Sequence, residues 1–153
     1  MADEPCILVG MDDKPASEYA LVQALELASS RGTSLVIVQV IGGYDPFKKM
    51  EYGAHEHIVD TSAEAQKLEA RVQKLVSAWA ADTGVAAPPV VCEVQVGPAG
   101  RVLSESAERH GANLVVVGNR NRSKLSRAVL GSVAEDLLRR AKVAVLVVRG
   151  KDA

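Results

Sequence analysis

The segment from Gly118 to Ser132 contains the residue types of an anion-binding site. Gly118 follows an apolar run and lets the backbone leave that run close to a ligand. Gly131 and Ser132 stand where a last helix is expected to begin, and the free N–H groups and dipole of a helix N-terminus favour a phosphate. Ser132 adds a hydroxyl, which either donates to such a phosphate or only caps the helix. These residues alone leave the two interpretations of Ser132 equally open.

Four basic residues crowd the same segment: Arg120, Arg122, Lys124 and Arg127. They either attract a phosphate, with Arg120 and Arg122 favoured because a guanidinium binds it bidentately, or form a solvated basic loop. Nucleic-acid binding is disfavoured, because no aromatic residues are interleaved and the net charge of the chain is -1. Any anion site must therefore be local.

Two common phosphate-binding motifs are excluded by the spacing of the glycines. The stretch GNRNRSK lacks the glycine that a Walker A loop places directly before its lysine. The dinucleotide fingerprint requires three close glycines after an early strand, and this segment comes late in the chain.

Other reactive side chains give no catalytic or metal motif. Cys6 and Cys92 match no paired metal or redox spacing and are predicted to be reduced core thiols. His55 and His57 flank Glu56 but lack further ligands nearby, so they are interpreted as solvated loop residues.

Short apolar runs alternate with helical patterns, and this alternation positions the candidate groups. Five strands are predicted, at Cys6–Met11, Ser34–Ile41, Val90–Val96, Leu114–Val117 and Lys142–Val148. Helices are predicted from Pro15 to Gly32, from a Thr61/Glu64 capping box to Gly84, from Gly97-Pro98 to Gly111, and near Ser132–Arg140. The pattern predicts one domain over residues 1–153, an α/β fold with a single open, doubly wound, parallel five-stranded sheet and helices on both faces. Ligands of such sheets bind beyond the carboxyl ends of the strands.

The expected location is the cytoplasm. Met1 to Pro5 lacks the basic-then-apolar layout of a signal peptide, and the longest apolar runs are too short to span a bilayer. No membrane partner is expected.

The chain resembles the nucleotide-binding kind of universal stress protein. That kind carries Gly, two residues, Gly, nine residues, then Gly and Ser or Thr, between its fourth strand and last helix. This chain has Gly118, Asn121 in place of the second glycine, and Gly131-Ser132 at the same spacing. The stretches ILVGMD, VIVQVI and RAKVAVLVVRG also resemble the strands of that family.

The resemblance implies an adenine nucleotide alpha hydrolase-like fold and a set of site residues. Asp12 and Val40 would hold the adenine and ribose end of ATP, AMP or cyclic AMP, with Mg²⁺ as an optional companion. The phosphate end would be held by residues of the late segment and the last helix: Gly118, Arg120, Asn121, Arg122, Gly131, Ser132 and Val133. Asn tolerates the left-handed backbone region that a glycine would adopt, at a small cost.

The resemblance further implies a stress-response or signalling protein that is not an enzyme beyond weak ATP hydrolysis. It implies a homodimer through the strand Val143 to Val148, an apolar edge open to pairing. The alternative is a nucleotide-independent dimeric interaction protein, because Asn121 replaces a glycine as in the subclass that lacks the motif.

Overall fold

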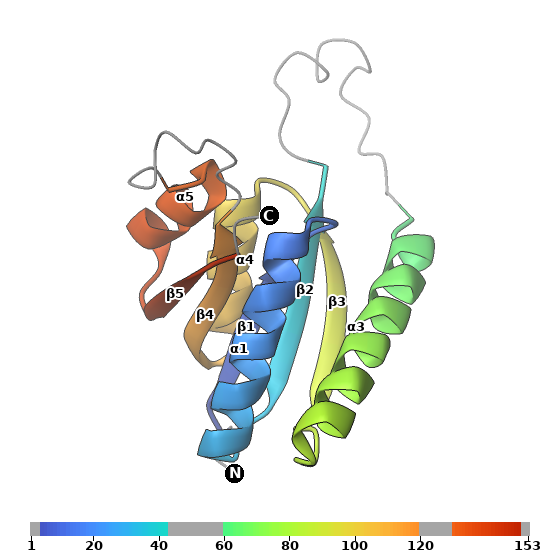
Figure 1. Cartoon of the computed structure of the whole chain (residues 1–153). Coiled ribbons are helices and arrows are strands. Elements are labelled where there is room, and N and C mark those ends of the chain that lie inside the picture. The colour runs from blue at the N-terminus through green and yellow to red at the C-terminus, as the bar shows by residue number, and fades with distance from the viewer. Residues whose placement is uncertain (1–3, 43–59, 120–129, 151–153) are drawn as a thin grey trace.

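A computed structural model describes residues 4–42, 60–119 and 130–150 of the chain (Figure 1). Its elements are β1 (Cys6–Met11), α1 (Pro15–Arg31), β2 (Leu35–Ile41), α3 (Ser62–Thr83), β3 (Val90–Val96), α4 (Ala99–His110), β4 (Ala112–Asn119), α5 (Ser132–Arg140) and β5 (Ala144–Arg149). The described strands form one parallel sheet in the order β3-β2-β1-β4-β5. The predicted α/β fold class is confirmed, and β5 lies at the sheet edge as expected.

Helices cover both faces of the central strands β1, β2 and β4, which explains why these are nearly continuous apolar runs, whereas the edge strand β3 carries Glu93 and Gln95 and is half-exposed. Odd-numbered β1 residues such as Val9 pack with α1 and α3, whereas even-numbered ones such as Leu8 pack with α4 and α5. The alternation follows from the two-residue period of a strand. Side chains on both faces of β1 are therefore buried, and β1 is the centre of the core.

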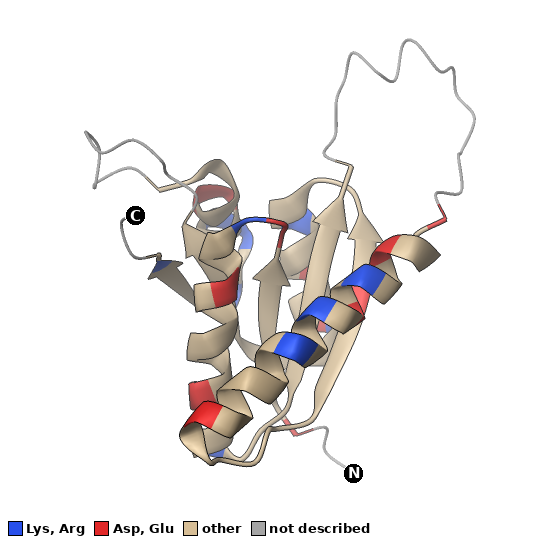
Figure 2. Ribbon diagram, turned by 45° about the vertical axis from the view of Figure 1, so that its right-hand side comes forward, with Lys and Arg blue, Asp and Glu red and all other residues tan. Residues whose placement is uncertain are grey.

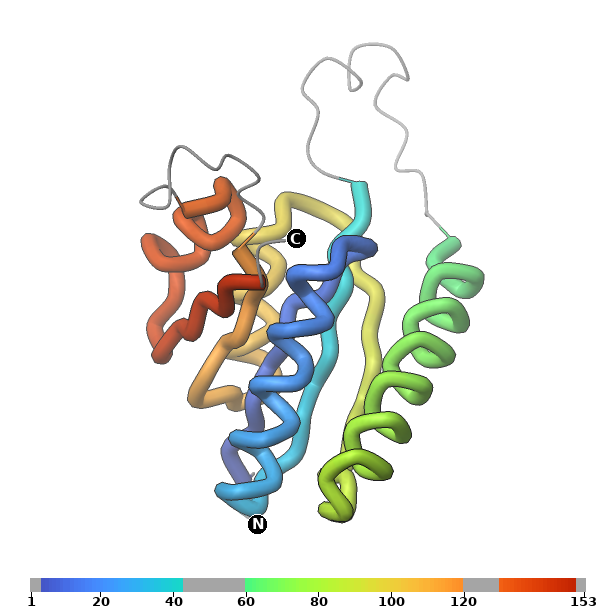
Figure 3. Tube along the Cα trace, viewed as in Figure 1, coloured from blue at the N-terminus to red at the C-terminus, as the bar shows by residue number. Residues whose placement is uncertain are grey.

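The order of the strands reverses next to β1. The chain proceeds from β1 outward to β2 and β3, then crosses over to place β4 on the other side of β1. The carboxyl ends of β1 and β2 and the N-termini of α1 and α3 lie at one edge of the sheet (Figure 3). A crevice at this edge, between β1 and β4, is the expected ligand position in a doubly wound sheet.

Helix ends follow the predicted glycine signals, with one correction. Gly32, Gly84 and Gly111 end α1, α3 and α4 with positive φ angles of 66°, 71° and 66°. The predicted Thr61 capping box is wrong, because Thr61 makes no side-chain capping hydrogen bond. Thr61 is still the N-cap residue, and Asp60 just before it bonds the first helical residue: the Asp60 Oδ1 accepts hydrogen bonds from the backbone N–H of Ser62 at 2.9 Å and from the Ser62 hydroxyl at 2.6 Å.

None of the described helices is long and apolar enough to cross a bilayer. The cytoplasmic location stays a prediction.

Candidate functional site

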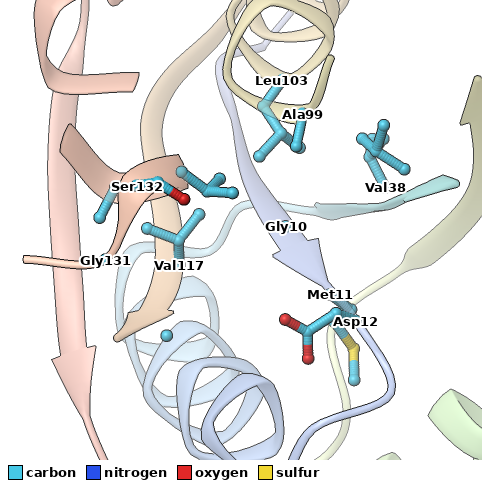
Figure 4. A pocket seen from close by; sticks show the side chains of 13 residues that line it. Gly10, Met11, Asp12, Val38, Ala99, Leu103, Val117, Gly131 and Ser132 are labelled. Carbon is cyan, nitrogen blue, oxygen red and sulfur yellow. The ribbon is translucent and has the colours of Figure 1, made fainter. Parts of the chain in front are cut away.

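A cavity of about 230 Å³ opens at the carboxyl edge of the sheet, on the face covered by α4 and α5 (Figure 4). Its walls come from the ends of three strands and the starts of two helices: Gly10, Met11, Asp12, Val38, Val40, Ala99, Leu103, Val117, Gly118, Gly131, Ser132, Val133 and Ala134. Most of these side chains are apolar or absent, and the polar groups are concentrated in Asp12 and at the start of α5. The cavity therefore has an apolar wall and two polar ends.

Gly10 of β1 lets the side chains of Leu103 and Val117 approach the strand at the cavity wall. A Cβ atom at this position would lie 2.9 Å from Leu103 Cδ1 and 3.0 Å from Val117 Cγ1, closer than side chains normally approach. The missing side chain lets α4 pack directly over β1 at the inner end of the cavity. Sequence reasoning missed Gly10, although a glycine inside an apolar strand is a known signal of close approach.

Asp12 is half-buried at the tip of β1, and its carboxylate lies at the edge of the cavity (Figure 4). Its Oδ1 accepts a hydrogen bond from the backbone N–H of Lys14 at 2.7 Å. The carbonyl oxygen of Asp12 lies 3.0 Å from the hydroxyl of the buried Ser17. The carboxylate is therefore held in place by its own loop.

The start of α5 forms the opposite end of the cavity. Gly131 is the N-cap residue, with φ -61° and ψ 156°, and Ser132 is the first helical residue. The capping interpretation of Ser132 is wrong, since no side-chain capping hydrogen bond is made and the N-cap position belongs to Gly131. Ser132 instead lines the cavity.

Asn119 is a residue of this end that sequence reasoning missed. Its side-chain Oδ1 accepts a hydrogen bond from the backbone N–H of Gly131 at 3.0 Å. This bond joins the end of β4 to the start of α5 and engages one of the N–H groups expected to bind phosphate. The only sequence signal was an Asn beside the motif glycine Gly118.

Gly118 lines the cavity but is required for a different reason than the one predicted. Its φ is not positive, and a Cβ atom on it would lie 2.5 Å from the carbonyl oxygen of Ala16 and 3.0 Å from the backbone nitrogen of Ser17. The absent side chain thus makes room for the first turn of α1. The backbone of Gly118 still borders the cavity.

The structure brings together six of the nine predicted site residues. Asp12, Val40, Gly118, Gly131, Ser132 and Val133 all line the same cavity. Arg120, Asn121 and Arg122 lie outside the described residues. These six residues are far apart in the sequence, and the parallel pairing of β1 with both β2 and β4 brings them to the same edge of the sheet. Their individual roles remain predictions.

No cluster of three or more His, Cys, Asp or Glu side chains suited to a metal ion occurs within residues 4–42, 60–119 and 130–150. His55 and His57 fall outside those ranges. Both thiols are free; Cys6 is buried and Cys92 half-buried. Burial raises the pKa of the Cys6 thiol, and burial followed by the nearby Glu69 charge raises the pKa of Cys92 to about 11.

Relatives with the same overall sequence pattern share the universal stress protein name. The universal stress protein Rv2005c of Mycobacterium tuberculosis is 34% identical over 146 residues, which cover 94% of this chain and 45% of that protein. Sll1388 of Synechocystis is 30% identical over 154 residues, covering 94% of this chain and 96% of that protein. The chain thus spans less than half the length of the mycobacterial relative and nearly all of the cyanobacterial one.

Solved structures share the fold. A universal stress protein in complex with cAMP superposes with a TM-score of 0.62 at 24% identity, covering 97% of this chain and 98% of that one. The Archaeoglobus fulgidus universal stress protein in complex with dAMP gives a TM-score of 0.61 at 19% identity, covering 95% and 98%. The sequence model of the universal stress protein family matches residues 6–149. With this match over nearly the whole chain, the protein belongs to the universal stress protein family.

Proposed function

We propose that the chain binds an adenine nucleotide, either ATP or AMP with cyclic AMP as a third candidate, and serves stress-response signalling. The observation that carries the proposal is the cavity at the strand-order reversal, with apolar walls between a carboxylate and a helix N-terminus. Its volume of about 230 Å³ suits a mononucleotide better than a dinucleotide. Sites for small ligands are typically apolar with a few placed polar groups.

The apolar wall supports binding of the base. Val38 and Val40 project from alternate positions of β2 on the same face as Leu103 of α4. A flat purine buried between them would lose little hydrogen bonding on its faces. Asp12 accepts but cannot donate when ionised, so it pairs with the donor groups of a nucleoside, the exocyclic amine or the ribose hydroxyls.

The start of α5 supports binding of the phosphate. The N–H groups of its first turn lack partners within the helix and carry the positive end of the dipole. The Gly131 N–H is engaged by Asn119, so we assign the phosphate to the N–H groups of Ser132 and Val133 and to the Ser132 hydroxyl. The Asp12 carboxylate repels phosphate, which favours the same orientation.

The named ligands of two structural neighbours agree in class with this proposal. One neighbour is described in complex with cAMP and another with dAMP, both adenine mononucleotides. At identities of 24% and 19% these likenesses show the fold, and they support the choice of ligand to test in this chain.

We assign binding rather than turnover to the site, with at most weak ATP hydrolysis. Among the described residues that line the cavity, Asp12 is the sole carboxylate. Fast phosphoryl transfer requires several positioned groups around the transferred phosphate. An Asp12→Asn variant that abolished a substantial ATPase rate would contradict this assignment.

Calorimetric titration with AMP, ATP and cAMP, with and without Mg²⁺, tests the proposal. Val40→Trp places an indole in the cavity wall and is expected to abolish binding. The matched control is Val91→Trp on the neighbouring strand β3, where the side chain is 56% exposed and outside the cavity. The proposal fails if the wild-type protein binds none of the three at millimolar concentration, or if Val40→Trp binds as the control does.

One observation favours a second candidate, a nucleotide-independent dimeric interaction protein. The Asn119 side chain already satisfies the Gly131 N–H group, as a bound phosphate would. In both candidates we propose a homodimer through the edge strand β5, whose central residues are half-buried in the single chain. Analytical ultracentrifugation of the wild type and Val147→Lys tests the dimer, which the lysine is expected to dissociate.

A further inference from the structure

Arg71 of α3 reaches the loop that carries Asp12. Its Nε and Nη2 atoms donate to Glu18 Oε1 at 3.2 and 3.0 Å. Nη1 donates to the carbonyl oxygen of Asp12, and Nη2 lies 3.4 Å from the carbonyl oxygen of Lys14. One guanidinium thus joins the first turn of α1 to the tip of β1.

These contacts come from the face of the sheet opposite the cavity. α1 and α3 cover one face, and Figure 2 shows charged residues along both helices. The Asp12 side chain lines the cavity on the other face, with α4 and α5. Arg71 therefore contacts the backbone of Asp12 from the α1/α3 face of the sheet, while the Asp12 carboxylate faces the proposed ligand on the other face.

Hydrogen bonds from Lys14, Ser17 and Arg71 converge on the β1–α1 loop. The Lys14 N–H fixes Asp12 Oδ1 at 2.7 Å, and Ser17 Oγ lies 3.0 and 2.9 Å from the carbonyl oxygens of Asp12 and Lys14. Both carbonyl oxygens point toward Ser17 and the Arg71 guanidinium. A planar guanidinium holds several acceptors in a fixed arrangement, which a flexible lysine ammonium cannot reproduce.

We propose that Arg71 is a positioning residue of the nucleotide site, which holds the Asp12 carboxylate in its binding orientation from the far face of the sheet. This inference rests on the proposed function. Arg71 and Glu18 are 28% and 42% exposed, so solvent partly screens their ion pair, and thermal unfolding of the variants measures what the pair contributes to stability. Their geometric effect on Asp12 is then separable from unfolding.

The experiment measures AMP affinity by calorimetry for the full chain and for Arg71→Met, Arg71→Lys and Lys74→Met. We expect Arg71→Met to bind AMP about tenfold more weakly, the size of a lost hydrogen bond. Arg71→Lys keeps the positive charge but lacks the planar guanidinium, and we expect it to bind AMP nearly as weakly as Arg71→Met does. Lys74 lies on the next turn of α3 and is exposed, so Lys74→Met is the matched control and should bind as the wild type does.

A double-mutant cycle shows whether Arg71 acts through Asp12. Asp12→Asn removes the charge and keeps an acceptor for the Lys14 N–H, which preserves the loop. If Arg71 acts through the carboxylate, the double variant should bind AMP within about twofold of Asp12→Asn alone. Thermal unfolding of every variant confirms that the fold is retained.

The outcomes separate the two proposals. Wild-type protein that binds no AMP refutes the proposed function, and the role of Arg71 falls with it. Wild-type binding with an unchanged affinity in Arg71→Met refutes the positioning role alone. Losses that multiply in the double variant also refute it, because independent effects would show that Arg71 does not act through Asp12.

Discussion

Replacing Gly118 with alanine tests the packing between β4 and α1. The sequence favoured this glycine as a point of ligand approach, whereas its missing side chain faces the carbonyl oxygen of Ala16. A Cβ atom there would lie 2.5 Å from that oxygen, about 0.9 Å short of the 3.4 Å where ordinary contact begins. The obstacle is backbone, so no side chain can rotate away.

The loss of stability follows from the packing contacts that α1 would lose if it shifted away from the sheet. Its buried stripe packs against the sheet: Ser17, Ala20, Leu21, Ala24, Leu25 and Ala28. Overpacking a well-packed site costs about 1–3 kcal/mol, and we expect the upper end because the helix must shift as a body. At 153 residues, about 3 kcal/mol lowers the Tm by roughly 6–12 °C.

Thermal and urea unfolding followed by circular dichroism measures this effect, with Gly150→Ala as the matched control. A Cβ atom on Gly150 would lie 3.3 Å from Tyr19 Cδ2, a side-chain atom that can move. The control should stay within about 0.5 kcal/mol of the wild type. A Gly118→Ala protein as stable as the control would show that the close approach of α1 is not a constraint.

Three further predictions concern local groups. Asn119→Ala removes the acceptor of the Gly131 N–H and should cost about 1 kcal/mol in urea unfolding; an unchanged midpoint would show that the bond contributes nothing. With a pKa of about 11 instead of 9.0, the Cys92 thiol should react with iodoacetamide at pH 8 about a hundredfold more slowly than a free thiol. Mass spectrometry of the alkylated protein measures this rate, and a rate equal to that of a free thiol would contradict the burial of Cys92. Hydrogen bonds from Ser62 lower the pKa of Asp60 in the folded protein. The stabilising effect of Asp60 should therefore be present above the pKa of the unfolded chain and be lost as the pH falls through the lower folded pKa. A difference in stability between wild type and Asp60→Ala that persisted in strong acid would refute this.

Much of the fold was predictable because its signals are local. Apolar runs indicated the five parallel strands, of which the central ones are largely buried and the edge strands β3 and β5 are not. Gly32, Gly84 and Gly111 indicated helix ends, as observed. Ends that depend on a specific side-chain geometry were less predictable. Thr61 is the N-cap residue of α3, yet its side chain makes no capping hydrogen bond, and the preceding Asp60 accepts one from the Ser62 N–H instead.

The candidate site was predictable where the resemblance supplied a motif. Asp12, Val40 and Gly131 belong to segments far apart in the sequence, yet they line one cavity. Gly10 lies within the stretch ILVGMD but was not singled out, and neither was Leu103, because their importance arises from the packing of α4 over β1. A pattern along the chain carries no information on which atoms meet across the sheet.

The sequence by itself determined the alternation of strands and helices, the family, and the edge of the sheet at which the cavity lies, because periodicity and motif spacing can be read along the chain. Tertiary structure alone decided that Gly118 makes room for α1, that Asn119 engages the Gly131 N–H, and that Arg71 holds the Asp12 loop from the opposite face. Each of these is a contact between groups 12 to 102 positions apart, and only the folded backbone brings such groups together.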